Sequence, residues 1–296
     1  MSSSIKSGIW MLLASLNFAI LNTLVKYLST DFHLSQIIFF RSIFAVLFLL
    51  PWIISGGLSS LKINSLKLQI VRCILAVLAM YLWFYSISKI PLAEATAINF
   101  TAPIFGAIFA IFLLNEKIRH RRLIAIFASL VGALIIIRPG IIHLNVFILT
   151  TLIASILMGL ASVYIKKITL VDHPNAVVFY MPLVLSMVSL IPCIIFWKTP
   201  SLSSYLLLIS TGLAAFLAHV CVTKAFSASD ATFVLIFDYL RLPITAALAF
   251  LIFDETTNFW IWIGGLIIFS SSIYVAYRER THENKQTTSM FNAKRL

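Results

Sequence analysis

Apolar residues run through this chain in long blocks that short polar or turn-forming segments separate. Each block has about the length, roughly 20 residues, that a helix needs to cross the hydrocarbon of a membrane. Open strands cannot satisfy their backbone groups in lipid, so the pattern predicts helices rather than strands. The predicted spans are residues 8–28, 35–54, 70–88, 91–114, 122–138, 145–165, 176–197, 204–223, 230–253 and 258–277. We therefore predict an all-α membrane protein with ten transmembrane helices and a disordered cytoplasmic tail over 279–296.

The composition excludes an ordinary soluble domain, because 61% of the residues are hydrophobic and only 11% are charged. Basic residues outnumber acidic ones by 22 to 10, which in a soluble protein would suggest a nucleic-acid partner. Cytoplasmic loops of membrane proteins also collect basic residues. With both termini in the cytoplasm, 16 basic residues including Arg72 fall on that side, 4 fall outside, and Arg41 and Arg241 lie in the membrane. Topology thus accounts for the charge, and no nucleic-acid partner is expected.

The two halves of the chain match each other at an offset near 140 residues. An acid-Ala-Thr triplet, a proline within a span and an acid-rich pair at the end of the span occur in the same order in each half. They are residues 94–96, Pro103 and residues 115–116 in the first half, and residues 230–232, Pro243 and residues 254–255 in the second. Because each half holds an odd number of spans, we predict two inverted five-helix repeats, 1–140 and 141–278. Inverted repeats give inward-open and outward-open states around a midplane site, which is typical of secondary transporters.

On these residues, the chain resembles the EamA-type branch of the drug/metabolite transporter (DMT) superfamily, over about residues 7–278. The resemblance implies ten spans, two five-helix repeats and cytoplasmic termini. An overall likeness to S-adenosylmethionine uptake transporters of obligate intracellular bacteria implies uptake of S-adenosylmethionine across the inner membrane, in exchange for S-adenosylhomocysteine. An exporter of amino acids or related metabolites is the alternative within the superfamily. The expected partners are a small-molecule substrate and membrane lipid. The sequence leaves open whether the chain forms a homodimer.

A charged group within a span is costly and tends to face a cavity or a partner. Asp238 and Arg241 share a helix face at spacing i,i+3. They either neutralise each other or meet a substrate cation and a substrate carboxylate. Tyr81 and Tyr85 lie one turn apart, so they either stack an adenine and attract a sulfonium or simply pack. Arg41 is predicted to reach towards the outer headgroups.

Uncharged polar groups and the repeated motif supply the remaining candidates. Three residues are candidates for substrate binding, with interhelical hydrogen bonds as the alternative: Asn17, Asn99 and His219. Four are candidates for gating or ion coupling, with helix-dipole and bending effects as the alternative: Glu94, Asp230, Pro103 and Pro243. Lys26 and Lys166 end spans on opposite faces and are predicted to anchor at headgroups.

The sequence contains no recognisable catalytic motif. There is no HExxH, no GxSxG and no GxxxxGK[ST] segment, and the six histidines are scattered along the chain. We therefore predict no catalytic residue, no metal site and no cofactor. A membrane-embedded enzyme remains a remote alternative to a transporter.

Overall fold

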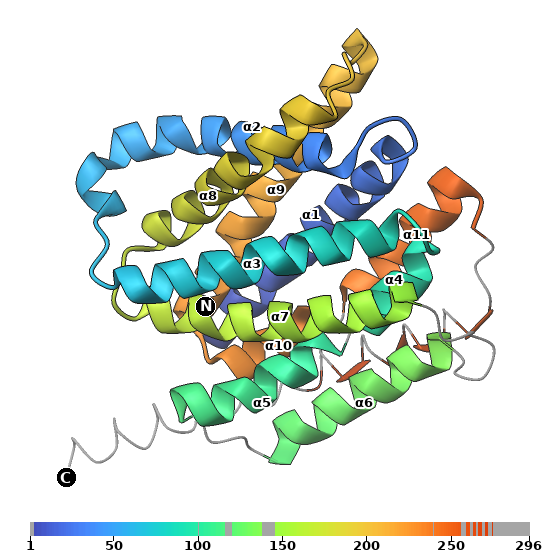
Figure 1. Ribbon diagram of the computed structural model, residues 1–296. Coiled ribbons are helices and arrows are strands. Elements are labelled where there is room, and N and C mark those ends of the chain that lie inside the picture. Colours follow the sequence, from blue (N-terminus) through green and yellow to red (C-terminus); the bar gives the residue numbers. More distant parts are fainter. Residues whose placement is uncertain are drawn as a thin grey trace.

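The computed structural model describes residues 3–99, 101–115, 120–137, 146–238 and 240–255, and a few separate positions between 259 and 274. In these residues the regular structure is helical and contains no strand, as the apolar blocks predict (Figure 1). The elements are α1 (Ser3–Leu28), α2 (Leu34–Gly56), the short 3-10 helix η1 (Leu58–Leu61), α3 (Leu66–Ile87), α4 (Leu92–Asn99), α5 (Ala102–Leu114), α6 (His120–Ile137), α7 (Val146–Thr169), α8 (Pro174–Ile195), α9 (Leu202–Ala228), α10 (Ala231–Asp238) and α11 (Arg241–Phe253).

Six of these helices are long and apolar enough to cross a membrane: α1, α2, α3, α7, α8 and α9. The apolar segments within α5 and α11 are shorter. Most of the predicted span 258–277 and all of the predicted tail 279–296 lie outside the described residues. The described part is thus consistent with a membrane transporter.

The fourth and ninth predicted spans, 91–114 and 230–253, each contain two helices in the structure rather than one. In the first, α4 ends at Asn99 and α5 begins at Ala102; in the second, α10 ends at Asp238 and α11 begins at Arg241. Proline has no N–H group and fits the first turn of a helix better than its interior. Pro103 and Pro243 both lie in the first turn of the second half-helix, so each break precedes a proline rather than following from a bend at it.

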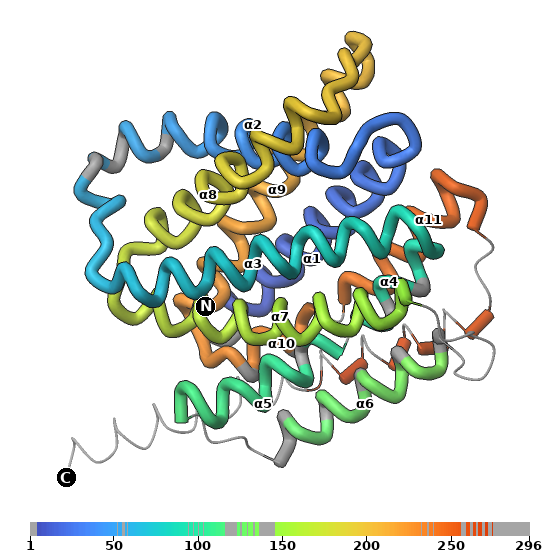
Figure 2. Tube along the Cα trace, viewed as in Figure 1, coloured from blue at the N-terminus to red at the C-terminus, as the bar shows by residue number. Residues whose placement is uncertain are grey.

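The helices pack around a common centre, with α1 against α9, α3 against α7, and α2 against α8 and α9 (Figures 1 and 2). The half-helix α5 packs on α7, and α11 packs on α1. Glycine permits the closest of these approaches. A Cβ atom added to Gly159 would lie 2.6 Å from the carbonyl oxygen of Ala102, so α5 and α7 meet backbone to backbone there.

Local structure repeats at about the offset that the sequence shows. His33 and His173 precede α2 and α8, and each accepts a hydrogen bond at Nδ1 from the backbone N–H two residues later. Asn115 and Asp254 follow α5 and α11, and both adopt the left-handed conformation with a φ of 52°. Corresponding helices of the two halves therefore begin or end with the same backbone geometry.

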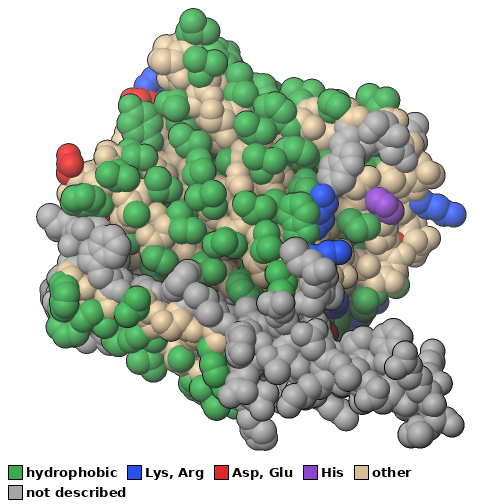
Figure 3. Space-filling model, turned by 180° about the vertical axis from the view of Figure 1, so that it is seen from behind, with side chains coloured by type: hydrophobic (Ala, Val, Ile, Leu, Met, Phe, Trp, Pro, Cys, Tyr) green, Lys and Arg blue, Asp and Glu red, His purple; other side chains and the backbone are tan. Residues whose placement is uncertain are grey.

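The outer surface is strongly apolar. Large hydrophobic side chains such as Ile54 and Leu251, both 74% exposed, point outwards from the helices. Figure 3 shows apolar side chains spread over the described part of one face, with few charged groups among them. Soluble monomers rarely expose such extensive apolar surface, so this exterior suits lipid rather than water.

Candidate functional site

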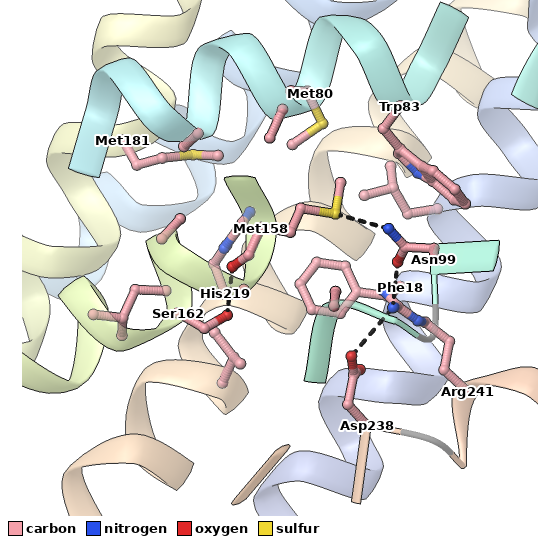
Figure 4. Close-up of a pocket in the computed structure, with 18 of the residues that line it drawn as sticks. Phe18, Met80, Trp83, Asn99, Met158, Ser162, Met181, His219, Asp238 and Arg241 are labelled. Carbon is pink, nitrogen blue, oxygen red and sulfur yellow. Dashed lines mark hydrogen bonds and ion pairs between the residues drawn. The ribbon is translucent and has the colours of Figure 1, made fainter. Parts of the chain in front are cut away.

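A cavity of about 130 Å³ lies among the helices (Figure 4). Its walls come from α1, α2, α3, α4, α5, α7, α8, α9, α10 and α11. Apolar and aromatic side chains make up most of the lining, with a small number of polar groups, as is typical of ligand pockets. The polar groups fall into two sets, which we call the half-helix cluster (Asn99, Asp238 and Arg241) and the guanidinium corner (Arg41, Arg72 and His219).

The half-helix cluster forms where the two broken spans meet. Asn99 is the last residue of α4, Asp238 is the last residue of α10, and Arg241 is the first residue of α11. Arg241 Nη2 donates to Asn99 Oδ1 at 2.9 Å and to Asp238 Oδ2 at 3.1 Å (Figure 4). The buried guanidinium is therefore balanced by a carboxylate of its own chain.

Asn99 fixes this cluster to α7 as well. Its amide Nδ2 donates to Ser155 Oγ at 3.1 Å and lies 3.3 Å from the sulfur of Met158. The Asn99 side chain is fully buried. It contacts Arg241 in α11 and both Ser155 and Met158 in α7. The half-helix ends are thus joined to each other and to a long helix by side-chain hydrogen bonds.

The guanidinium corner lies on α2, α3 and α9. Arg41 Nη2 lies 3.1 Å from His219 Nε2, and Arg72 lines the same cavity as both of them. A guanidinium can only donate, so Nε2 accepts in this contact and the neutral imidazole carries its proton on Nδ1. Arg72 Nη1 donates to the carbonyl oxygen of Val177 in α8. Neither arginine forms an ion pair with a carboxylate in the described part of the chain.

Aromatic rings connect the two sets. The ring of Phe18 lies 5.7 Å from the Arg241 guanidinium and meets the His219 ring edge-on at 5.5 Å. Phe84 lies under the Arg41 guanidinium at 5.8 Å. Trp83 donates from Nε1 to Asn22 Oδ1 at 3.1 Å and presents its ring to the cavity (Figure 4). The centre of the cavity is therefore a π-rich surface between two charged ends.

Four of the candidate residues from the sequence come together on this cavity: Asn99, His219, Asp238 and Arg241. The other candidates for substrate binding do not line it. Tyr81 packs partly buried beside the core of α1, α2 and α3, and Tyr85 is 41% exposed against Phe147. Asn17 Nδ2 donates to the carbonyl oxygen of Leu13 on its own helix.

The candidates for gating lie at the helix breaks and starts. Asp230 is exposed directly before α10, where its carbonyl oxygen accepts from the N–H of Val234. Pro243 is partly buried in the first turn of α11. The side chains of Glu94 in α4 and Pro103 in α5 lie outside what the structure describes.

The prediction for one basic residue is wrong, and a second basic residue lines the cavity although it was not a predicted site residue. Arg41 is 1% exposed and faces the cavity instead of reaching towards headgroups, because α2 is packed there against α9. Arg72 is 2% exposed in α3 and lines the same cavity, and we had not named it as a candidate site residue. Its position inside the predicted span 70–88 was the signal that could have identified it.

Lys26 and Lys166, which we predicted to anchor at headgroups, both make contacts within the protein. Lys26 at the end of α1 forms a salt bridge with Glu255, whose Oε1 also lies 3.5 Å from the N–H of Leu92 at the start of α4. Lys166 near the end of α7 donates to the carbonyl oxygens of Phe226 and Ser229 at 3.0 and 2.9 Å. Each lysine thus ties a long helix to the start or end of a neighbouring segment.

Comparison with known proteins assigns the chain to a family. The EamA-like transporter family matches residues 5–138 and again residues 145–277. A S-adenosylmethionine uptake transporter of Rickettsia bellii is 31% identical over 94% of this chain and 95% of its own. A riboflavin transporter of Vibrio cholerae is 28% identical over 95% and 96%, and a pseudopaline exporter of Pseudomonas aeruginosa is 28% identical over 89% and 94%.

A solved crystal structure shares the fold with a TM-score of 0.78 at 15% sequence identity, over 95% of this chain and 99% of the other. The relatives from Rickettsia bellii, Vibrio cholerae and Pseudomonas aeruginosa are named as transporters or exporters of different small molecules. The apolar exterior, the six helices able to cross a membrane and the twofold family match agree with one another. The protein is a multi-pass membrane protein that belongs to the EamA-like transporter family of the drug/metabolite transporter superfamily.

Proposed function

We propose that this protein is a secondary transporter that takes up S-adenosylmethionine across the bacterial inner membrane, in exchange for S-adenosylhomocysteine. The observation that carries the proposal is the central cavity, which places a carboxylate, three guanidiniums and several aromatic rings around one space. Sequence identity of 30–31% to S-adenosylmethionine uptake transporters of Rickettsia supports this substrate. The protein acts by binding and releasing its substrate unchanged and is not an enzyme.

The chemistry of S-adenosylmethionine suits this lining. The molecule combines an adenine ring, a sulfonium, an ammonium and a carboxylate. Trp83 and Phe18 offer π surfaces for stacking the ring and attracting the sulfonium. Asp238 Oδ1 is buried and has no hydrogen-bond partner among the described residues, so it is available to accept from the ammonium. Removing the methyl group leaves S-adenosylhomocysteine with the same ring, ammonium and carboxylate, which is why both would fit.

Two inverted five-helix repeats would provide the alternating access. In two such repeats α1 corresponds to α7, α3 to α9 and α5 to α11. The contact of α1 with α9 then corresponds to the contact of α7 with α3, and the contact of α1 with α11 corresponds to that of α7 with α5. Both pairs of contacts exist. In this proposed arrangement both termini would be cytoplasmic, and the half-helix ends before Pro103 and Pro243 would lie near the midplane, as in other transporters with discontinuous helices.

Uptake in intact cells tests the proposal. A bacterium without its own S-adenosylmethionine uptake would express the full chain, and accumulation of labelled S-adenosylmethionine would be compared with empty vector at equal membrane abundance. We expect saturable uptake that external S-adenosylhomocysteine inhibits and internal S-adenosylhomocysteine accelerates. The label should be recovered unchanged inside the cell.

Labelled riboflavin serves as the matched comparison, because several relatives are named riboflavin transporters. Uptake of riboflavin without uptake of S-adenosylmethionine would overturn the proposed substrate. Faster loss of preloaded amino acids from expressing cells, with no uptake of either compound, would favour the metabolite exporter. Chemical conversion of the label would favour an enzyme.

A further inference from the structure

The guanidinium corner, formed by Arg41, Arg72 and His219, has a role that the transporter fold alone does not require. We propose that it is the anion subsite of the cavity and binds an oxyanion of the substrate, which in S-adenosylmethionine is the carboxylate. The proposal rests on the function proposed above, because it assigns a binding site to the carboxylate end of that substrate. It also makes a prediction about oxyanions in general that holds whatever the transported molecule is.

Both arginines are buried, and neither has a carboxylate as counter-charge among the described residues. Arg41 has two nitrogens, Nε and Nη1, that are buried and without a hydrogen-bond partner, and Arg72 has one, Nε. Burying a charge without a partner is costly, and an apolar side chain at either position would avoid that cost. The described lining carries three arginines and one aspartate, a formal balance of +2 with His219 neutral. The cavity therefore lacks negative charge at this end.

An oxyanion supplies what is missing. Guanidinium groups present their N–H donors in a planar fork that matches the two oxygens of a carboxylate. Nδ1 of His219, which carries the proton when Nε2 accepts from Arg41, is also buried and without a partner. The corner thus holds four N–H donors on three helices that no acceptor in the described part of the chain satisfies.

The half-helix cluster does not offer the same site. Arg241 already contacts Asp238 and Asn99, so an oxyanion there would compete with a carboxylate of the protein. The substrate would therefore lie with its oxyanion at Arg41 and Arg72 and its cationic part towards Phe18 and Asp238. The class of substrate that fits is an amphipathic metabolite with an oxyanion at one end and a positive or aromatic part at the other.

Simple ligands test the subsite without assuming the substrate. The purified full chain in detergent would be heated with benzoate, phenyl phosphate or the neutral benzamide at equal millimolar concentrations. A ligand that binds only the folded protein raises its melting temperature. We expect at least one of the two anions to raise it more than benzamide does, and the stronger anion tells a carboxylate site from a phosphate site. Arg41→Gln and Arg72→Gln should each remove the difference.

Matched variants separate the subsite from general charge effects. Lys198→Gln also removes a cation, but from an exposed position outside the cavity, and should leave the difference intact. Arg41→Lys keeps the charge and should retain part of it even if Arg41→Gln folds poorly. Equal shifts with anion and amide in the wild type, or a difference that survives both glutamine variants, would overturn the subsite.

The proposed substrate provides a second arm. Decarboxylated S-adenosylmethionine lacks only the carboxylate, and we expect it to compete with uptake at least tenfold more weakly than S-adenosylmethionine, as expected for loss of a charged hydrogen-bonded contact. In Arg72→Gln the two should compete equally. Equal competition in the wild type would overturn the subsite and leave the uptake function standing. Absence of uptake, together with the benzoate or phenyl phosphate effect, would overturn the substrate and leave the subsite standing.

Discussion

The half-helix cluster and the guanidinium corner lie on one cavity but balance their charges differently. In the cluster, Arg241 contacts a carboxylate three residues away and an amide from another span. In the corner, two more deeply buried arginines have a neutral imidazole and a backbone carbonyl as their hydrogen-bond partners among the described residues. A buried ion pair contributes little net stability, but removing one partner is strongly destabilising. The comparison teaches that the first set holds the broken spans together, whereas the second set is left for a ligand.

The largest effect is expected when the half-helix cluster is made to resemble the corner. Asp238→Asn leaves Arg241 buried without its carboxylate, and such a change typically lowers the free energy of unfolding by about 3–5 kcal/mol. We expect a clear loss of melting temperature in detergent and uptake of labelled S-adenosylmethionine at background. Arg41→Gln, by contrast, should abolish uptake with no loss of melting temperature.

The double variant Asp238→Asn/Arg241→Gln is the control for that experiment. It removes both charges, so it should recover most of the stability but none of the uptake. A single variant Asp238→Asn that melts like the wild type would contradict the structural role of the pair.

The reverse experiment makes the corner resemble the cluster. His219→Glu would give Arg41 a carboxylate at the position where the imidazole nitrogen now lies, 3.1 Å from Nη2. Without substrate, the His219→Glu variant should be more stable than the wild type. Its melting temperature should rise by about 2–4 °C for each kcal/mol added to the free energy of unfolding. Uptake should fall to background because the new carboxylate occupies the oxyanion site. His219→Gln has nearly the same size without the charge and should give neither the rise nor a complete loss; full uptake in His219→Glu would refute the comparison.

A smaller effect is expected at the neutral member of the cluster. Asn99→Ala removes the amide acceptor of Arg241 and the donor to Ser155, which should cost about 1–3 kcal/mol of stability through the unsatisfied groups left behind. The KM for uptake should rise several-fold while membrane abundance stays near normal. Ser155→Ala removes only one of these contacts and should give less than half the effect. An Asn99→Ala variant with wild-type KM would show that Asp238 alone positions Arg241.

Much of the fold follows from hydropathy, but the helix breaks do not. The lengths of apolar blocks fix where a chain can cross lipid, and the described long helices lie within a few residues of the predicted spans. The breaks at Asn99 and Asp238 were missed because a proline within an apolar block is compatible with either a bent helix or a new one. What distinguishes the two is the packing of α5 on α7 through Gly159, a contact between segments about 55 residues apart.

Contacts within the site were predictable only where the two residues are close in sequence. The i,i+3 spacing of Asp238 and Arg241 indicates their pairing, and the structure has that pair. Asn99 comes from a span 142 residues away from Arg241, and no local pattern connects the two. Arg41 and Arg72 lie near the ends of predicted spans, where reaching towards headgroups or a loop is the more common reason for a basic residue.

The smallest effect is expected from an uncharged contact on the same cavity. Trp83→Phe keeps an aromatic face and removes the hydrogen bond from Nε1 to Asn22 Oδ1. A neutral hydrogen bond contributes about 1 kcal/mol net, so the KM for uptake should change by at most roughly fivefold. Trp83→Leu, which removes the ring as well, should raise KM further if the ring stacks the substrate. If Trp83→Phe lowers uptake as far as Arg41→Gln does, then the neutral hydrogen bond matters as much as the buried charge, and the contrast between the two charged sets would not explain recognition.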